Sequence, residues 1–194
     1  MTPMMKGGSL EDRLILDVTA QQRLSKLPGA PVGGFEPLSW QDRLTVAVDV
    51  VTGLLYLHTP YPHTHKPTIL HHDIKPNNVL LDQVKRARLA DMGLARTQRQ
   101  SAAHLTTATS ITVTNGYLDD YYLTTGLFDE IADAYAVGVT LLVLLSGSEA
   151  VDPVQGHIIC RYYVDDVREV ANERAQWPSV VAQEVHKVCM DLVK

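Results

Sequence analysis

The chain has 194 residues, of which 45% are hydrophobic and 20% charged, and its formal net charge at pH 7 is −5. These values are typical of one globular domain that is long enough to bury a core, and they exclude a disordered chain. The acidic balance also argues against nonspecific nucleic-acid binding as the main function.

Helix-capping spacings predict the first two helices. Ser9 and Asp12 have the spacing of an N-cap and its partner, which predicts a short helix ending near residue 16. Residues 25–38 hold three prolines and three glycines, so we expect a loop there.

Ser39 and Asp42 repeat the capping spacing ahead of a long amphipathic helix that ends before the TPYPHTHKP segment. Its apolar residues recur at helical spacing and are predicted to form one buried face: Trp40, Leu44, Ala47, Val48, Val51, Leu54, Leu55 and His58.

The middle of the chain reads as small strands and the end as helices. Three short apolar runs, at 68–70, 79–81 and 88–90, suit strands better than helices. Residues 97–115 are polar and threonine-rich, which predicts an extended loop. Residues 131–145 predict a central helix that is hydrophobic on nearly every face. A last helix carries a stripe of Val181, Val185, Val188, Cys189 and Leu192.

We expect a cytoplasmic protein without a membrane segment. The most apolar stretch, residues 134–145, is 12 residues long, whereas a membrane span needs about 20. Cys160 and Cys189 offer neither a disulfide framework nor a paired metal motif, which favours a reducing compartment.

The run HHDIKPNNVLLD, residues 71–82, and ADMGLA, residues 90–95, carry the most chemical information. Asp73 follows one predicted strand, with Asn78 five residues later, and Asp91 ends another strand 18 residues after Asp73. If these strands pair, the three side chains meet in one cluster. The oxygens of Asn78 and Asp91 suit Mg²⁺, Asp73 could accept a proton from a hydroxyl, and Lys75 could neutralise a transferring phosphoryl group.

These motifs resemble those of eukaryotic-type protein kinases, in particular the catalytic loop H-R-D-x-K-x-x-N and the D-F-G motif. The resemblance implies that Asp73 is the catalytic base and that Lys75 is the phosphate-contacting lysine of serine/threonine kinases. It also implies that Asn78 and Asp91 bind Mg²⁺ for ATP, and that His71 is a core histidine bonded to a backbone carbonyl.

The flanking segments are similar to the same family in the same order. TNGYLDDYY, residues 114–122, resembles T-x-G-Y-x-A-P-E, which implies that Thr114 bonds near the catalytic aspartate. DAYAVGVTLLVLLSG, residues 133–147, resembles the central kinase helix, in which Asp133 would cap the catalytic-loop backbone. MKGGSLEDRL, residues 5–14, resembles the segment after the hinge in plant receptor-like and interleukin-receptor-associated kinases.

The chain departs from the family pattern in four ways. It shows no Gly-rich loop, no V-A-I-K lysine and no partner glutamate. His72 replaces the arginine of H-R-D, which argues against activation by loop phosphorylation, while Thr106, Thr107, Thr109 and Ser110 remain candidate acceptors. Asp119-Asp120-Tyr121 replaces A-P-E, and Met92 replaces phenylalanine, a mild exchange between apolar residues.

The predicted fold class is α+β, a mainly helical kinase large lobe spanning residues 1–194 from just after the hinge, without the N-terminal small lobe. The predicted function is phosphoryl transfer from ATP to serine or threonine hydroxyls of a protein substrate. A silent, kinase-derived binding module is the alternative. We expect an exposed apolar face around Leu10 and Leu14, which a partner could cover. His63, His65, His71 and His72 lack the spacing of a metal site.

Overall fold

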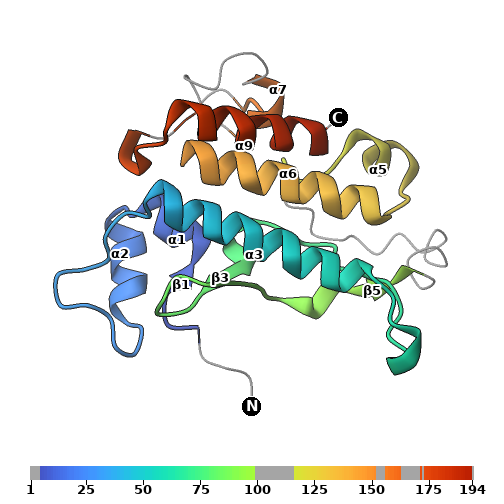
Figure 1. Cartoon of the computed structure of the whole chain (residues 1–194), viewed down its shortest axis with the longest axis horizontal. Helices are drawn as coiled ribbons and strands as arrows, with labels where there is room; N and C mark the ends of the chain where they lie inside the picture. Colours follow the sequence, from blue (N-terminus) through green and yellow to red (C-terminus); the bar gives the residue numbers. More distant parts are fainter. Residues whose placement is uncertain (1–4, 99–115, 152–155, 163–170, 172, 194) are drawn as a thin grey trace.

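The computed structural model describes residues 5–98, 116–151, 156–162, 171 and 173–193. These residues form an α+β arrangement of helices around a few very short strands (Figure 1). The helices are α1 (Leu10–Ile15), α2 (Val18–Ser25), α3 (Trp40–His58), α5 (Asp120–Thr125), α6 (Glu130–Ser146), α7 (Ile159–Tyr162) and α9 (Ser179–Leu192). Single 3₁₀ turns are η1 (Pro62–Thr64), η2 (Pro76–Asn78), η3 (Met92–Leu94) and η5 (Glu173–Ala175).

The strands form two small antiparallel sheets. Strand β3 (Val79–Leu81) lies between β1 (Gly8–Ser9) and β4 (Ala87–Leu89), while β2 (Ile69–Leu70) pairs with β5 (Arg96–Thr97). The strand predicted at 79–81 is confirmed, and those predicted at 68–70 and 88–90 lie within one residue of β2 and β4.

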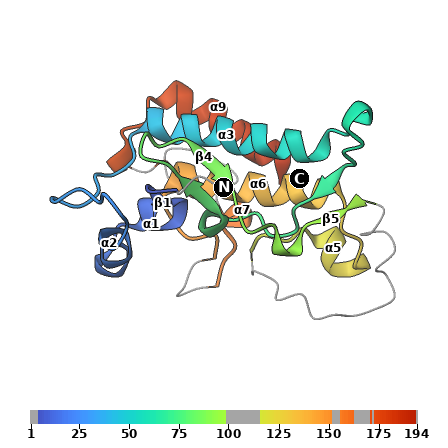
Figure 2. The same cartoon turned by 90° about the horizontal axis from the view of Figure 1, so that it is seen from below.

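Helix α6 is the centre of the fold, as its all-round hydrophobicity predicted. It packs against both α3 and α9 and lies between them in Figure 1. Figure 2 shows from below that all three helices run along the long axis of the molecule. Asp129 caps its first turn by accepting hydrogen bonds from the backbone of Ile131 and Ala132, and Gly147 ends it with a φ of 69°. Burial of its aliphatic side chains, at about 1.5–3 kcal/mol each, is a large part of the stability of the fold.

Helices α3 and α6 are antiparallel and are joined by a polar contact at each end. Arg43, near the start of α3, donates through Nη1 to the carbonyl of Leu144 at the end of α6, at 2.7 Å. At the opposite end, Nε2 of His58 lies 2.9 Å from Oδ2 of Asp133. Burial lowers the pKa of Arg43 to about 10, so its guanidinium stays charged at neutral pH and suits the negative end of the α6 dipole.

The predicted start of α3 is confirmed, but its predicted buried face is partly wrong. Ser39 and Asp42 form the capping box. However, Val48, Val51 and Leu55 are 59%, 43% and 64% exposed. The helix instead turns the side carrying Arg43, Val46, Ala47, Val50, Leu54 and Leu57 towards the core, because β4 and α6 pack against that side.

Two further expectations about the N-terminal part are corrected. Leu10 is 0% and Leu14 is 5% exposed, so the exposed apolar face predicted around them is wrong; both belong to the main hydrophobic core. Helix α2 was not predicted, and its N-cap is Asp17, which accepts from the backbone of Ala20 at 2.6 Å. The helix α1 predicted after Ser9 is confirmed.

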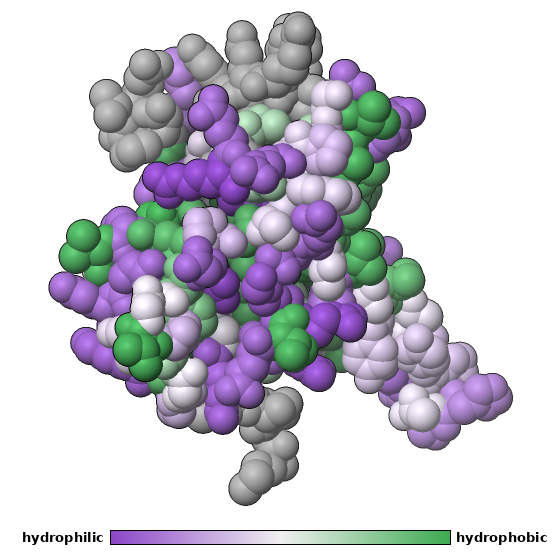
Figure 3. All heavy atoms as spheres, turned by 60° about the vertical axis from the view of Figure 1, so that its left-hand side comes forward, coloured by the Kyte–Doolittle hydropathy of each residue, from purple (hydrophilic) through white to green (hydrophobic). Residues whose placement is uncertain are grey.

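The face of the molecule that Figure 3 turns forward is mainly hydrophilic, and hydrophobic residues are scattered over it. On α9, Cys189 is fully buried, but Val188 of the same predicted stripe is 52% exposed. No helix within the described ranges combines the length and the apolar character that a membrane crossing requires.

We predict that Gly138→Ala destabilises the domain by about 1–3 kcal/mol, because a methyl group overpacks the contact between α6 and the end of α9. A Cβ at Gly138 would lie 2.7 Å from Cγ1 of Val193 and 2.8 Å from Cβ of Leu192. The loss should appear although alanine is the better helix former by about 1 kcal/mol. Urea unfolding measures it.

Gly33→Ala is the matched control, because a Cβ there would meet no heavy atom within 4 Å. Its free energy of unfolding should stay within about 0.5 kcal/mol of the parent. Equal stability of the two variants would contradict the packing argument.

Candidate active site

The loop between β2 and β3 is held by the buried carboxylate of Asp133. This residue lies in the first turn of α6 and is 0% exposed. Its Oδ2 accepts from the backbone N–H of His71 at 2.7 Å, and its Oδ1 from that of His72 at 3.0 Å. His58 adds its ring nitrogen to Oδ2 at 2.9 Å. A buried charge is tolerated only when it is well partnered, and these contacts fix the start of the loop against α3 and α6.

His71 links the start of this loop to Ala90, the residue that follows β4. The side chain is fully buried, and Nε2 lies 3.0 Å from the carbonyl oxygen of Ala90, while Nδ1 accepts from the backbone N–H of Asp73 at 3.3 Å. These partners require a neutral ring with its proton on Nε2. Ala90 also donates its N–H to the carbonyl of Asn78 at 2.8 Å. The backbone just before Asp91 is therefore fixed to both ends of the loop.

Asp73, Lys75 and Asn78 form a closely connected group. The predicted cluster of Asp73 and Asn78 with Asp91 assumed that the strands before Asp73 and Asp91 pair, whereas β2 pairs with β5 and β4 pairs with β3. Nδ2 of Asn78 donates to the backbone oxygen of Asp73 at 2.8 Å and to its Oδ2 at 2.7 Å. Nζ of Lys75 lies 2.9 Å from Oδ1 of the same carboxylate. The amide oxygen of Asn78 takes no part in these bonds, because both are made by its amide nitrogen.

Asp91 occupies the left-handed region, with φ 58° and ψ 62°, directly after the β4 segment. Aspartate tolerates this conformation better than most residues. Its Oδ1 accepts from the backbone N–H of Gly93 at 3.4 Å, and the side chain is exposed. A Cβ at Gly93 would lie 3.1 Å from that oxygen, so a larger residue there would require the carboxylate to shift by a few tenths of an ångström.

His72, in the loop between β2 and β3, also has a left-handed conformation, with a φ of 70°. Its ring stacks on Phe128, with centroids 3.9 Å apart and planes 15° apart. Burial lowers the pKa of His72 below its ordinary value of 6.5, although the nearby carboxylate of Asp133 acts in the opposite direction.

The replaced A-P-E segment has a local structural role of its own. Asp119 is buried and caps α5, because its Oδ1 accepts from the backbone N–H of Tyr122 at 3.0 Å. Thr114 and the possible phosphorylation sites of residues 106–110 lie outside the described residues.

No group of three or more histidine, cysteine, aspartate or glutamate side chains in the described ranges could hold a metal ion alone. A Mg²⁺ site at Asn78 and Asp91 therefore requires further oxygen atoms from a substrate or water. Sequence reasoning missed His58 as a partner of Asp133 and assigned it to an apolar face. The feature of the sequence that could have indicated this contact is the polar ring of His58 at the end of an apolar stripe.

The sequence matches the family model of the protein kinase domain over residues 4–194. A probable receptor-like protein kinase of Arabidopsis thaliana is 44% identical over 116 residues, which are 60% of this chain and 18% of that protein. Calcium/calmodulin-regulated receptor-like kinase 1 of the same plant is 40% identical over 146 residues, 75% of this chain and 30% of that protein. The LRR receptor-like serine/threonine-protein kinase ERL1, also from Arabidopsis thaliana, is 42% identical over 115 residues, 59% of this chain and 11% of that protein. The chain thus spans less than a third of the length of each relative.

We predict that Asp133→Ala destabilises the domain by about 3 kcal/mol or more, because the buried N–H groups of His71 and His72 lose their charged acceptor. Urea unfolding measures the loss, and amide hydrogen exchange should show faster exchange at those two groups. Asp129→Asn, at the cap of the same helix, is the control, and it should cost only a few tenths of a kcal/mol. Equal effects of the two variants would show that the carboxylate of Asp133 is not the anchor.

A second prediction concerns acid stability. As the pH falls through 6.5, the unfolded chain protonates His72, whereas the folded chain, with its lowered pKa, resists protonation. The free energy of unfolding therefore decreases as the pH falls below about 6.5. His72→Asn removes the titrating imidazole and places at this position a residue that tolerates positive φ. Between pH 7 and 5 the variant should lose less stability than the parent in urea unfolding, and parallel pH curves would contradict this account.

Proposed function

This chain belongs to the protein kinase domain family, and we propose that it transfers the γ-phosphoryl group of ATP to serine or threonine hydroxyls of a protein substrate. We assign it to the large lobe of such a domain. The observation that carries the proposal is the pair of hydrogen bonds from the Asn78 amide nitrogen to Asp73, in which the amide oxygen takes no part.

Asp73 is the proposed catalytic residue. Its carboxylate is oriented by Asn78 on Oδ2 and by Lys75 on Oδ1, so little reorganisation is needed when a hydroxyl arrives. In the reaction the hydroxyl oxygen forms a bond to the γ-phosphorus, the bond from that phosphorus to ADP breaks, and the hydroxyl proton passes to Asp73. Lys75 supplies a positive charge next to the carboxylate, where the transferring group carries negative charge.

The residues present fit a magnesium ion. Asn78 offers an amide oxygen and Asp91 an exposed carboxylate, and hard oxygen donors together with substrate phosphates are what Mg²⁺ takes. When bound, Mg²⁺ would neutralise charge on the phosphates of ATP. The protein fixes the backbone that carries both proposed ligands, because Ala90 is hydrogen-bonded to His71 and to Asn78.

Two further parts of the proposal rest on the relatives and on chemistry. The choice of serine and threonine is supported by Lys75 and by the serine/threonine-protein kinase among the relatives. A cytoplasmic location is supported by the use of ATP and by two buried, unpaired cysteines, which suit a reducing compartment. The arrangement of Asp73 and Asn78 supports an enzyme over a silent binding module, because such a module would have no need of it.

We predict that the chain binds ATP in a magnesium-dependent way and that Asp91→Asn weakens this binding at least about tenfold in calorimetry, because one anionic ligand is lost. Asp73→Asn should keep nucleotide binding but lower phosphoryl transfer to serine and threonine peptides by about 10²–10⁴-fold, through loss of the base.

Asp17→Asn is the matched control, because it removes the same charge at a helix cap where asparagine serves equally well. It should leave both ATP binding and transfer at the level of the parent. Magnesium-independent ATP binding, or transfer that survives Asp73→Asn, would overturn the proposal.

A further inference from the structure

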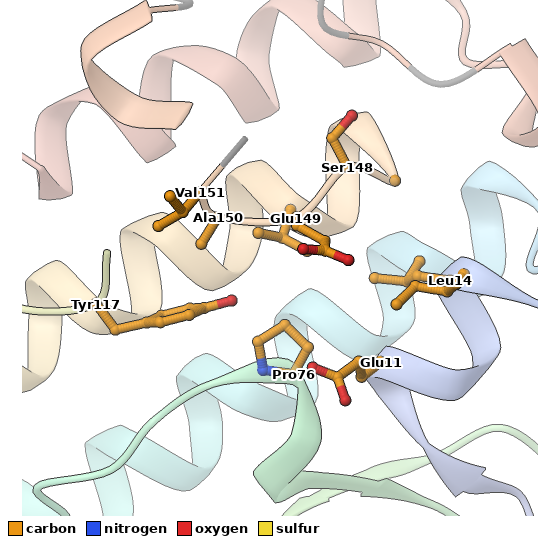
Figure 4. Close-up of a pocket in the computed structure, with 11 residues that line it drawn as sticks. Glu11, Leu14, Pro76, Tyr117, Ser148, Glu149, Ala150 and Val151 are labelled. Carbon is orange, nitrogen blue, oxygen red and sulfur yellow. The ribbon is translucent and has the colours of Figure 1, made fainter. Parts of the chain in front are cut away.

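The loop that carries Asp73 meets the segment from Tyr117 to Phe128 at two places. On one side, Pro76 of the loop and Tyr117 of the segment line the same cavity of about 310 Å³ (Figure 4). On the other side, the ring of His72 stacks on Phe128, with centroids 3.9 Å apart and planes 15° apart. The segment therefore bounds the loop both before and after Asp73.

Phe128 is itself held in place by the helices on either side of it. It lies between Gly126, which ends α5 with a φ of 70°, and Asp129, which caps α6. The ring of Tyr122 on α5 meets the Phe128 ring edge-on, with centroids 5.4 Å apart and planes 78° apart. This is one of the two favourable arrangements of aromatic rings. Two helix ends thus present the Phe128 ring to His72.

His72 needs such support because its φ of 70° is disfavoured for any residue with a side chain. The angle φ relates the N–H of a residue to its side chain, so contacts that hold both groups fix the angle. Asp133 accepts from the N–H at 3.0 Å, and Phe128 holds the ring. The next N–H, that of Asp73, donates to Nδ1 of His71 at 3.3 Å. These contacts together determine the direction in which the chain enters Asp73.

The stack suits the chemistry of both rings. Burial lowers the pKa of His72, so its imidazole is neutral at pH 7 and can lie against an apolar ring without a charged partner. Phe128 is only half-buried, so it buries less apolar area than a core phenylalanine does. Its flat face, rather than its volume alone, is what the neighbouring imidazole uses.

We propose that Phe128 is a positioning residue for the proposed phosphoryl transfer and that it acts through His72; the proposal rests on the proposed function. The Phe128 ring keeps the ring and the positive φ of His72 in place. The backbone of His72 in turn directs the carboxylate of Asp73 towards Asn78 and Lys75. Such support matters, because a displacement of about 1 Å at a catalytic group can cost about 10²-fold in rate.

The first test is Phe128→Leu, which keeps an apolar side chain but removes the flat ring. Its kcat for transfer to serine peptides should fall about 10- to 100-fold. Binding of ATP with Mg²⁺ in calorimetry should stay at the level of the parent, because the backbone at Asn78 and Asp91 is held through Ala90. A general loss of stability would reduce both quantities. Phe128→Tyr keeps the ring and should restore kcat.

Tyr121→Leu is the matched control, because it makes the same kind of exchange on α5 at a side chain that is 53% exposed. It should leave kcat and ATP binding unchanged. In the His72→Asn background, Phe128→Leu should cause little further loss of kcat, since the contact is already gone. Losses that multiply in the double variant, or a loss of kcat in Tyr121→Leu equal to that in Phe128→Leu, would overturn the proposed route through His72.

NMR spectroscopy tests the contact without any transfer reaction. The ring current of Phe128 should shift the imidazole proton signals of His72 upfield in the parent, and Phe128→Leu should remove this shift. The N–H of Asp73 should also exchange faster with solvent in this variant. Imidazole signals and an exchange rate that both stay unchanged would contradict the positioning role.

The two proposals can therefore fail separately. Transfer by the parent that Phe128→Leu leaves unchanged would reject the positioning role and leave the kinase function intact. A parent without transfer to any peptide would reject the kinase function, while the His72 signals and the Asp73 exchange rate would still decide whether Phe128 holds the loop.

Discussion

The fully buried carboxylate of Asp133 determines where the candidate site lies. It accepts hydrogen bonds from two successive backbone N–H groups, of His71 and His72, and contacts the ring of His58. A charge in the core is costly unless such partners surround it, so the start of the catalytic loop has little freedom relative to α3 and α6. His71 then bonds the carbonyl of Ala90, and this places the backbone before Asp91 beside the same loop. The proposed base and both proposed metal ligands thus depend on one interaction in the core.

The sequence predicted the features that depend on the spacing of a few neighbouring residues. The capping box at Ser39, the N-cap at Ser9 and the all-round apolar α6 each need only a few neighbouring residues, and all were found in the structure. Helix α2 was missed because only Ala20 and Leu24 of it are buried, which is too few for a stripe.

Features that depend on tertiary packing could not be predicted in this way. The buried side of α3 is selected by β4 and α6, and spacing alone placed it about one residue away. The site residues Asp73, Lys75 and Asn78 came from their spacing and from the family resemblance, whereas the partnership of His58 with Asp133 joins residues 75 positions apart. The cavity lined by Glu11, Pro76, Tyr117 and Glu149 brings together four distant segments, and no local pattern marks it.

Helix α6 also sets the distance between the catalytic group and the cavity. Asp133, at its start, anchors His72, while Val143, ten residues later and so about 15 Å along the axis, lines the cavity with Pro76. The loop from His72 to Pro76 spans at most about 14 Å, which is similar to that length along the helix. Because Arg43 and His58 hold both ends of α6 to α3, this distance is fixed by a packed core.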